Sequence, residues 1–201
     1  MNRKEEPSMR ARLPDEKPQP RRQRVLDDKP VSDSTPKNRA RPRPVAGKPS
    51  LKLKEHIVEV ISDSGEGAQR CGQAFGSIAA RMGKGVWTVE IIPAEIQPPP
   101  RSIAGASGNR IRVGSQPVTN GGDEADLVVA FNEQVLLSRL EAGELRPGCI
   151  VLMEDKWRGD PDPEIAESYV QIAEELVADG FKLYEIPMES ECLKHVADAR
   201  R

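Results

Sequence analysis

Aromatic residues are scarce in this sequence, and cysteines are few. Phe, Trp and Tyr make up 3% of its 201 residues, and all of them lie beyond residue 54. The three cysteines, Cys71, Cys149 and Cys192, are widely spaced and form no Cys-x-x-Cys pair. This spacing excludes an iron–sulfur cluster or a structural zinc site built from this chain alone, so no metal ligand is predicted. We expect three buried, reduced thiols, which are typical of the reducing cytoplasm.

Long apolar runs are absent as well. No stretch approaches the roughly 18 residues of a transmembrane helix, so we expect no membrane contact. The first 30 residues have no apolar segment of the kind that secretory signals contain. Acidic residues interrupt the basic ones there, which is not typical of a transit peptide. These absences predict a cytoplasmic protein.

Charge is divided unevenly along the chain. Residues 1–54 hold 16 of the 30 basic residues but only 7 of the 32 acidic ones, so their net charge is about +9. The remaining residues have a net charge of about −11. The same segment contains nine of the 18 prolines, and it buries too little apolar surface to offset the entropy of ordering its backbone. We predict a disordered tail over residues 1–54 and a folded domain over residues 55–201. The tail's charge suits an acidic partner, and the alternative is a solvated tail that only keeps the protein soluble. Nucleic acid is disfavoured because no aromatic residue is available to stack on bases.

Strand and helix patterns alternate in the folded part. The predicted strands cover residues 56–61, 86–92, 109–114, 126–131, 149–153 and 181–186. Helices are predicted up to about Met82, after Asn132 as N-cap, from Pro163 after Asp162 as N-cap, and over residues 188–196. This alternation predicts an α/β fold, with a mostly parallel sheet and helices on both faces in three Rossmann-like layers.

The helix before Met82 carries two patterns that predict how it packs. Gly72 and Gly76 stand four residues apart, so they share a face on which the backbone approaches a sheet closely. The apolar residues recur every three or four positions and predict a stripe that faces the core. That stripe consists of Ala68, Cys71, Phe75, Ile78, Ala79 and Met82.

Ligands of parallel sheets collect at the carboxyl ends of the strands, where residues 62–67, 131–134 and 154–162 form the loops. Gly65, Glu66 and Gly67 form the strongest motif, because a glycine-rich turn before a helix offers backbone N–H groups to phosphate. Arg70, however, stands where a dinucleotide-binding turn has its third glycine. The carboxylates of Asp63 and Glu66 also disfavour phosphate and instead resemble a capping box. A binding turn and a structural turn therefore both remain open.

Three arginines form a second candidate site. Arg110 and Arg112 stand two apart on a predicted strand and so share a face. Together with Arg101, in the preceding loop, they could bind an anion such as a coenzyme phosphate. Neutralisation by neighbouring carboxylates is the alternative.

No residue is predicted to be catalytic. His56 and His195 lie near the ends of predicted elements and far apart in the sequence, and no motif for a nucleophilic serine or cysteine is present. Trp157, in the loop after the fifth predicted strand, is compatible either with a satellite of the core or with a contact site.

Three stretches taken together resemble one family. They are residues 61–67 with Gly72, residues 88–112, and residues 123–132 followed by residues 145–148. Their order and spacing resemble the gamma domain of the 2-oxoacid:ferredoxin (acceptor) oxidoreductases, in the variety fused to the alpha subunit of 2-oxoglutarate-type enzymes. The resemblance covers about residues 56–198. The sequence departs from the family pattern where Ser62 and Ser64 replace glycines and where Arg101-Ser102 replaces an Arg-Gly-Gly run.

The resemblance implies a complex that oxidatively decarboxylates a 2-oxo acid, such as pyruvate or 2-oxoglutarate, to an acyl-coenzyme A. It places thiamine diphosphate and iron–sulfur clusters on partner alpha and beta subunits, with ferredoxin as an indirect partner and coenzyme A nearby. We therefore expect this chain to carry no cofactor and to be inactive alone. Two other functions fit the residues: a Rossmann-type nucleotide-binding regulatory module, and a scaffold whose basic tail recruits a partner.

Overall fold

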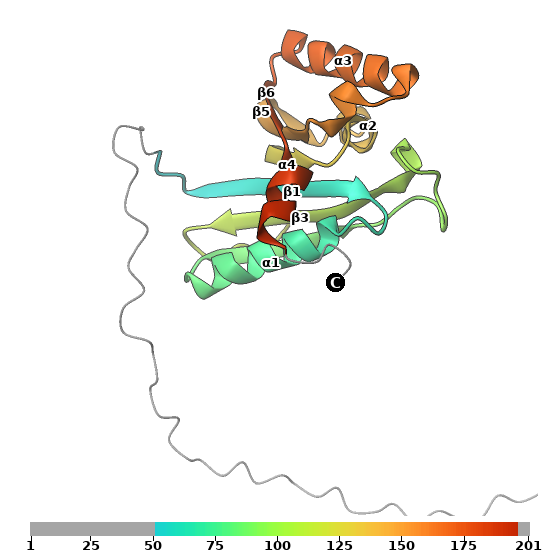
Figure 1. Cartoon of the computed structure of the whole chain (residues 1–201). Helices are drawn as coiled ribbons and strands as arrows, with labels where there is room; N and C mark the ends of the chain where they lie inside the picture. Colours follow the sequence, from blue (N-terminus) through green and yellow to red (C-terminus); the bar gives the residue numbers. More distant parts are fainter. Residues whose placement is uncertain (1–50, 197–201) are drawn as a thin grey trace, which may run out of the picture. The chain divides into compact units, whose positions relative to one another are not determined.

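The structure is a computed structural model that describes residues 51–196 (Figure 1). Most of the predicted tail therefore lies outside the described residues. The described part contains a six-stranded sheet in the order β2-β3-β1-β4-β5-β6. Its strands are β1 (Glu55–Asp63), β2 (Gly85–Ile91), β3 (Ala106–Gly114), β4 (Ala125–Ala130), β5 (Leu145–Glu154) and β6 (Lys182–Ile186). Its helices are α1 (Ala68–Arg81), α2 (Glu133–Glu141), α3 (Pro163–Ala178) and α4 (Met188–His195), with short 3-10 helices η1 (Ile103–Gly105) and η2 (Lys156–Gly159).

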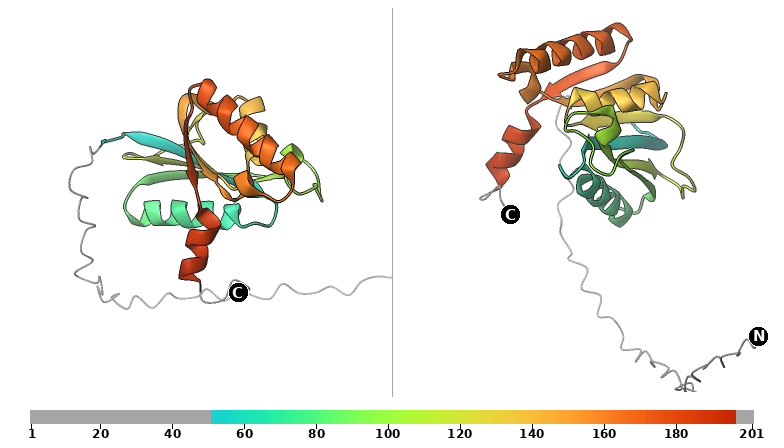
Figure 2. Two further views of the ribbon diagram at one scale, coloured as in Figure 1. Left: turned by 45° about the horizontal axis from the view of Figure 1, so that its top comes forward. Right: turned by 90° about the vertical axis from the view of Figure 1, so that its right-hand side faces the viewer.

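Five strands of the sheet run in one direction. The pairs β1–β4, β4–β5 and β5–β6 are parallel, whereas β3 is antiparallel to both of its neighbours, β1 and β2. No long helix connects β2 to β3, so this link lacks the crossover that parallel neighbours need. Helix α1 covers one face of the sheet, and α2 and α3 cover the other (Figures 1 and 2). The predicted α/β fold is confirmed.

The larger core lies between the sheet and helices α2 and α3. The near-continuous apolar strands β4 and β5 supply Val128 and Val151, both fully buried. Leu136 of α2 and Tyr169 of α3 are fully buried against them. A smaller core under α1 is built around Ile111 of β3.

Helix α1 packs through its glycines, as predicted. A Cβ atom on Gly72 would lie 2.5 Å from the Cβ of Asn109, and one on Gly76 would lie 3.1 Å from Cγ2 of Thr88. The predicted apolar stripe is wrong in part. Ala68 and Ala79 are buried beside the glycines, but the other four residues, Cys71, Phe75, Ile78 and Met82, are exposed. The glycines form the face of the helix that contacts the sheet, so the larger apolar side chains lie outside this face and are exposed.

The three thiols do not share one environment. Cys149 of β5 is buried, and desolvation raises the pKa of its thiol to about 12, so it stays protonated. Cys71 and Cys192 are exposed, and the prediction of burial is wrong for both. Cys71 belongs to the side of α1 that is turned away from the sheet, and Cys192 lies on α4, which has no buried residue.

The predicted N-caps of α2 and α3 are confirmed. The Oδ1 atom of Asn132 accepts a hydrogen bond from the backbone of Val135 at 2.9 Å. The Oδ1 atom of Asp162 accepts one from the backbone of Glu164 at 3.0 Å, and Pro163 occupies the first turn of α3.

Removing the cap of α3 tests this local signal. We expect Asp162→Ala to lower the free energy of unfolding by about 1 kcal/mol, because a backbone N–H of the first turn loses its partner. Glu167→Ala, on the exposed side of the same helix, should change it by less than about 0.5 kcal/mol. Urea unfolding followed by circular dichroism measures both, and equal effects would show that the cap contributes nothing specific.

Candidate functional site

The loops at the carboxyl ends of β1, β2 and β4 meet at one edge of the sheet. Asp63, the last residue of β1, joins them through one carboxylate oxygen. Its Oδ2 atom accepts hydrogen bonds from the backbone of Arg101 at 2.7 Å and from the side chain of Asn132 at 3.2 Å. The predicted loops 62–67 and 131–134 are therefore brought together, and Arg101 lies between them.

The Arg101 side chain links this edge to the loop after β5. Its guanidinium group forms an ion pair with the fully buried Glu133 and lies 4.3 Å from the ring centroid of Trp157. Lys156 also lies 4.3 Å from that centroid. The indole of Trp157 donates a 2.7 Å hydrogen bond to the carbonyl of Phe131. Trp157 packs against the core, as one of the two alternatives from the sequence predicts, and its ring also forms a cation–π contact with Arg101.

Several polar atoms at this edge retain hydrogen-bonding capacity. Within residues 51–196, Nη1 of Arg101, Oδ1 of Asp63 and Oε2 of Glu133 are buried and have no hydrogen-bond partner. Arg101 itself has a φ of 53°, a left-handed conformation that non-glycine residues rarely adopt. Such an arrangement, with unused donors and acceptors on a strained loop, is typical of functional sites.

The glycine turn differs from the predicted capping box. Helix α1 begins at Ala68, and its N-cap is Gly67, four residues beyond Asp63. Glu66 does accept a hydrogen bond from the backbone of Asp63 at 3.2 Å, but Asp63 does not cap the helix. Gly65 and Gly67 have φ values of 93° and 99°, which explains the glycines. The first N–H groups of α1 consequently have no side-chain cap.

A cavity of about 430 Å³ lies beside this uncapped helix end. None of its lining residues carries a carboxylate, although Asp63 and Glu66 belong to the same turn. Asp63 turns toward Arg101 instead, and Glu66 lines a different pocket. The cavity is lined by Ser62, Ser64, Gly65, Gly67, Ala68, Gln69, Arg70, Pro93 and Ser107.

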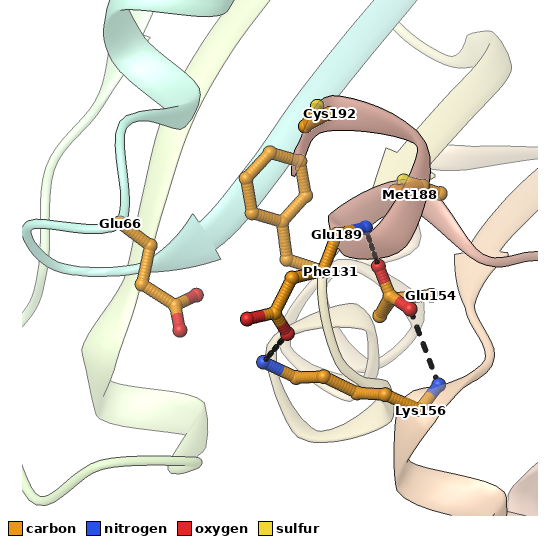
Figure 3. A pocket seen from close by; sticks show the side chains of 7 residues that line it. All are labelled: Glu66, Phe131, Glu154, Lys156, Met188, Glu189 and Cys192. Atoms are coloured by element: carbon orange, nitrogen blue, oxygen red, sulfur yellow. Dashed lines mark hydrogen bonds and ion pairs between the residues drawn. The ribbon is translucent and has the colours of Figure 1, made fainter. Parts of the chain in front are cut away.

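The pocket that receives Glu66 is apolar with an acidic rim (Figure 3). Lys156 forms a 2.9 Å ion pair with Glu189 there, and Glu154 accepts a hydrogen bond from the backbone of Glu189 at 2.7 Å. Desolvation, followed by the charge of Asp63, raises the pKa of Glu66 above its usual value. The single lysine is already paired, so this pocket of about 270 Å³ is less suited to an anion.

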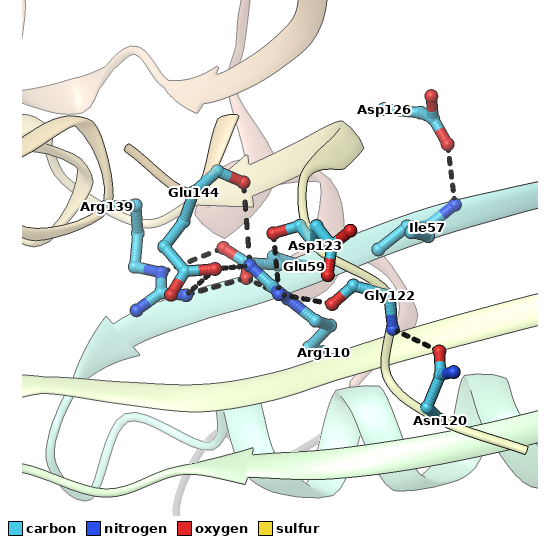
Figure 4. Close-up of polar contacts among 9 residues, drawn as sticks. All are labelled: Ile57, Glu59, Arg110, Asn120, Gly122, Asp123, Asp126, Arg139 and Glu144. Carbon is cyan, nitrogen blue, oxygen red and sulfur yellow. Dashed lines mark hydrogen bonds and ion pairs between the residues drawn. The ribbon is translucent and has the colours of Figure 1, made fainter. Parts of the chain in front are cut away.

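The other two predicted arginines belong to β3, away from the carboxyl ends of the parallel strands. Arg110 lies on the face of the sheet that meets Arg139 of α2 (Figure 4), and Arg112, two residues further along the strand, lies on the same face. Arg110 donates a hydrogen bond from Nε to Oε1 of the fully buried Glu59 at 2.7 Å, and it also pairs with Glu144. Burial opposes the charge of Arg110, but Glu59 and Glu144 outweigh burial and raise the pKa of its guanidinium group. Arg112 pairs with Glu55 at 2.7 Å. The alternative of neutralisation by carboxylates accounts for both arginines.

Glu59 and its second partner, Arg139, were not singled out from the sequence. Arg139 binds both carboxylate oxygens of Glu59 at 2.9 Å. The sequence contained a signal for this ion pair, because Glu59 is a lone carboxylate within an apolar strand and such a group requires a buried partner.

The family described as "Pyruvate ferredoxin/flavodoxin oxidoreductase" matches residues 59–200. The chain belongs to this family. Among its relatives, the 2-oxoglutarate oxidoreductase subunit KorA of Mycobacterium tuberculosis is 31% identical over 102 residues, which make up 51% of this chain and 15% of KorA. The resemblance inferred from the sequence motifs is thus confirmed.

Two solved structures are similar to this family member. One is a 2-oxoglutarate:ferredoxin oxidoreductase from Magnetococcus marinus with 2-oxoglutarate, coenzyme A and succinyl-CoA bound. It is 27% identical with a TM-score of 0.51, and the match covers 71% of this chain and 22% of that chain. Another is the gamma subunit of a keto/oxoacid ferredoxin oxidoreductase from Geobacter sulfurreducens, 16% identical with a TM-score of 0.40, covering 55% of this chain and 57% of that one. The chain spans less than a quarter of the length of KorA and of the Magnetococcus protein.

Across residues 51–196, no helix has the length and apolar character needed to cross a bilayer. Within the same residues, no three His, Cys, Asp or Glu side chains gather as metal ligands do.

Proposed function

We propose that this chain is the gamma-type component of a cytoplasmic 2-oxoacid:ferredoxin oxidoreductase, which oxidatively decarboxylates a 2-oxo acid to an acyl-coenzyme A. The family match over residues 59–200 carries the proposal. Two relatives named for 2-oxoglutarate favour that substrate over pyruvate. In this proposal, thiamine diphosphate and the iron–sulfur clusters belong to the alpha and beta partner subunits, which pass electrons to ferredoxin. The isolated chain is inactive.

Within this function, the cavity beside the glycine turn is the proposed site for a phosphate group of coenzyme A. The free N–H groups at the start of α1 and the helix dipole favour an anion, and Arg70 adds a positive charge at the cavity wall. Ser107, which is only 6% exposed, contributes a hydroxyl group to the same wall. The Magnetococcus relative, which holds coenzyme A, supports this choice of ligand.

The six candidates from the sequence are not equally suited to this role. Gly65 and Gly67 line the proposed phosphate site. Arg101 is a second candidate through its free Nη1 atom, although Glu133 already neutralises its charge. Glu66, Arg110 and Arg112 are left out of the proposal. Glu66 lines the acidic pocket, and both arginines are paired with carboxylates.

Reconstitution tests the proposal. We expect the chain to copurify with alpha and beta subunits and to support viologen reduction that depends on both 2-oxoglutarate and coenzyme A. Arg70→Gln should raise the KM for coenzyme A roughly tenfold with little change in kcat, since it removes one charge-assisted contact. Arg81→Gln, at the other end of α1, is the matched control and should leave KM unchanged.

The outcomes separate the two parts of the proposal. An alpha–beta complex that is equally active without the chain would contradict the function. An active complex in which Arg70→Gln and Arg81→Gln behave alike would contradict the phosphate site alone. Binding of a nucleotide by the chain, without any effect of coenzyme A, would favour the regulatory nucleotide-binding module instead.

A further inference from the structure

The two edge strands of the sheet, β2 and β6, are protected to different degrees against pairing with another chain. Strand β6 is five residues long, carries the charged Lys182 and Glu185, and is followed by Pro187. Strand β2 is seven residues long, contains no proline, and Glu90 is its only charged residue. A long edge strand with few charges and no proline is a template for pairing with another strand. Within residues 51–196, no strand pairs with the outer side of β2, and this open edge requires a physical explanation.

The side chains of β2 are exposed on the face opposite α1. Trp87 and Val89 are each 43% exposed, although both are large and apolar. Val86 and Thr88 lie on the other face, where Gly76 of α1 approaches them. Trp87 and Val89 thus form an apolar patch at the margin of the sheet.

The backbone groups that point outward from β2 follow from the pairing of β3. The backbone of Ser115 donates a 2.8 Å hydrogen bond to the carbonyl of Lys54, which extends the β1–β3 ladder by one residue pair. Since bonding alternates along an antiparallel strand, odd-numbered residues of β3 bond to β1 and even-numbered ones bond to β2. Those even-numbered residues pair with the odd-numbered residues of β2. The N–H and C=O groups of the even-numbered residues Val86, Thr88 and Glu90 consequently point to the open edge.

We propose that β2 pairs with β2 of a second copy of this chain, antiparallel and with the two-fold axis at Trp87, so that the two sheets become one. Trp87 then faces its own counterpart, and Val86 faces Thr88 of the second copy. Lys84 lies directly before the strand, and its backbone N–H is bonded to the carbonyl of Ala79 at 3.2 Å. The ladder therefore ends at Val86, but the Lys84 side chain still reaches Glu90 of the second copy, and the symmetry forms this opposite-charge pair twice. Aromatic pairs and opposite charges directly across antiparallel strands are both stabilising.

Charge selects this register over its neighbour. With the axis at Thr88, Glu90 would face Val86, and Lys84 would face Ile92, so no opposite charges would meet. The other contact of Glu90 is compatible with the proposed register. Gln73 of α1 reaches only Oε1 of Glu90, at 3.5 Å, which leaves Oε2 for Lys84 of the second copy.

The experiment exchanges the two charges on the full-length chain. We expect the natural chain to be a dimer by light scattering and analytical ultracentrifugation at micromolar concentration. Lys84→Glu and Glu90→Lys should each weaken the dimer by roughly tenfold or more, because like charges then meet twice. An equimolar mixture of the two variants should dimerise again, since every Glu then faces a Lys. Circular dichroism and thermal melting verify that each variant is folded.

Each remaining outcome overturns the proposal. A natural chain that is monomeric at all concentrations contradicts the second copy as the occupant of the edge, as does capture of an unrelated strand by a monomer. A dimer that neither charge variant weakens uses a different surface or register. If each variant by itself has a weaker dimer and the equimolar mixture does not restore dimerisation, Lys84 and Glu90 do not face each other.

Discussion

Replacing Gly72 with leucine is expected to lower the free energy of unfolding by about 3 kcal/mol, the upper part of the usual range for overpacking. A Cβ atom at this position would lie 2.5 Å from the Cβ of Asn109, well inside van der Waals contact. Asn109 cannot move aside easily, because it is 1% exposed and its side chain donates a 2.7 Å hydrogen bond to the carbonyl of Gln69. The added side chain must therefore lift α1 from the sheet.

A matched control separates this clash from a general effect of leucine on α1. Ala74→Leu places the same side chain on the exposed side of the helix and should change the unfolding free energy by less than about 0.5 kcal/mol. Urea unfolding monitored by circular dichroism measures both variants. Similar losses for Gly72→Leu and Ala74→Leu would refute the close approach of α1 to the sheet.

Breaking the buried ion network should have a comparable or larger effect. Glu59→Gln is expected to lower the unfolding free energy by about 3–5 kcal/mol. Glu59 is fully buried, and both of its carboxylate oxygens accept hydrogen bonds from arginines. When Glu59 loses its charge, the positive charges of Arg110 and Arg139 remain close to each other. Glu144 is then the carboxylate that still pairs with both.

The control for Glu59 is a similar pair near the surface. Glu55 pairs with Arg112, but its side chain is 50% exposed, so Glu55→Gln should cost at most about 1 kcal/mol. Urea unfolding at low and high salt distinguishes the two, because salt screens an exposed pair far more than a buried one. Replacing Glu59, Arg110 and Arg139 together with apolar residues should recover much of the loss. A loss for Glu59→Gln that disappears in high salt would contradict the buried network.

Local signals in the sequence were sufficient to predict most elements of the fold. The N-caps Asn132 and Asp162 were predicted correctly because capping depends on residues within one helical turn. The apolar runs of β4 and β5 also predicted buried central strands, because a run of apolar residues is itself the local signal of a strand buried on both faces. The reversed direction of β3 could not be predicted, because it depends on how the link after β2 returns to the sheet.

Helix α1 illustrates where periodicity misleads. Its larger apolar residues form a regular stripe, and periodicity alone assigns such a stripe to the core. The actual contact face is defined by the absence of side chains at Gly72 and Gly76, which allows the backbone to approach β2 and β3. Phe75 and Ile78 are left 41% and 58% exposed as a result.

The sequence predicted which loops meet at the candidate site, but it did not predict which side chains contact each other there. Parallel strands bring their carboxyl ends to one edge, so the meeting of the loops that carry Asp63 and Asn132 follows from the fold class. The contact of Arg101 with Glu133 and Trp157 joins three separate loops, and no sequence spacing encodes it. The directions of the Asp63 and Glu66 side chains were likewise not predictable, although they decide which cavity is free of carboxylates.

The positions of Trp87 and Trp157 give this molecule two separate optical reporters. They are its only tryptophans. The indole of Trp157 is held between Arg101 and Lys156, and its N–H group is fixed on Phe131, so its emission should respond when an anion disturbs either cation. Trp87 is exposed on an edge strand at a different place in the sheet and should respond to association. With Trp87→Phe, the remaining emission reports on the surroundings of Arg101 and Lys156, and with Trp157→Phe it reports on the exposed edge strand β2.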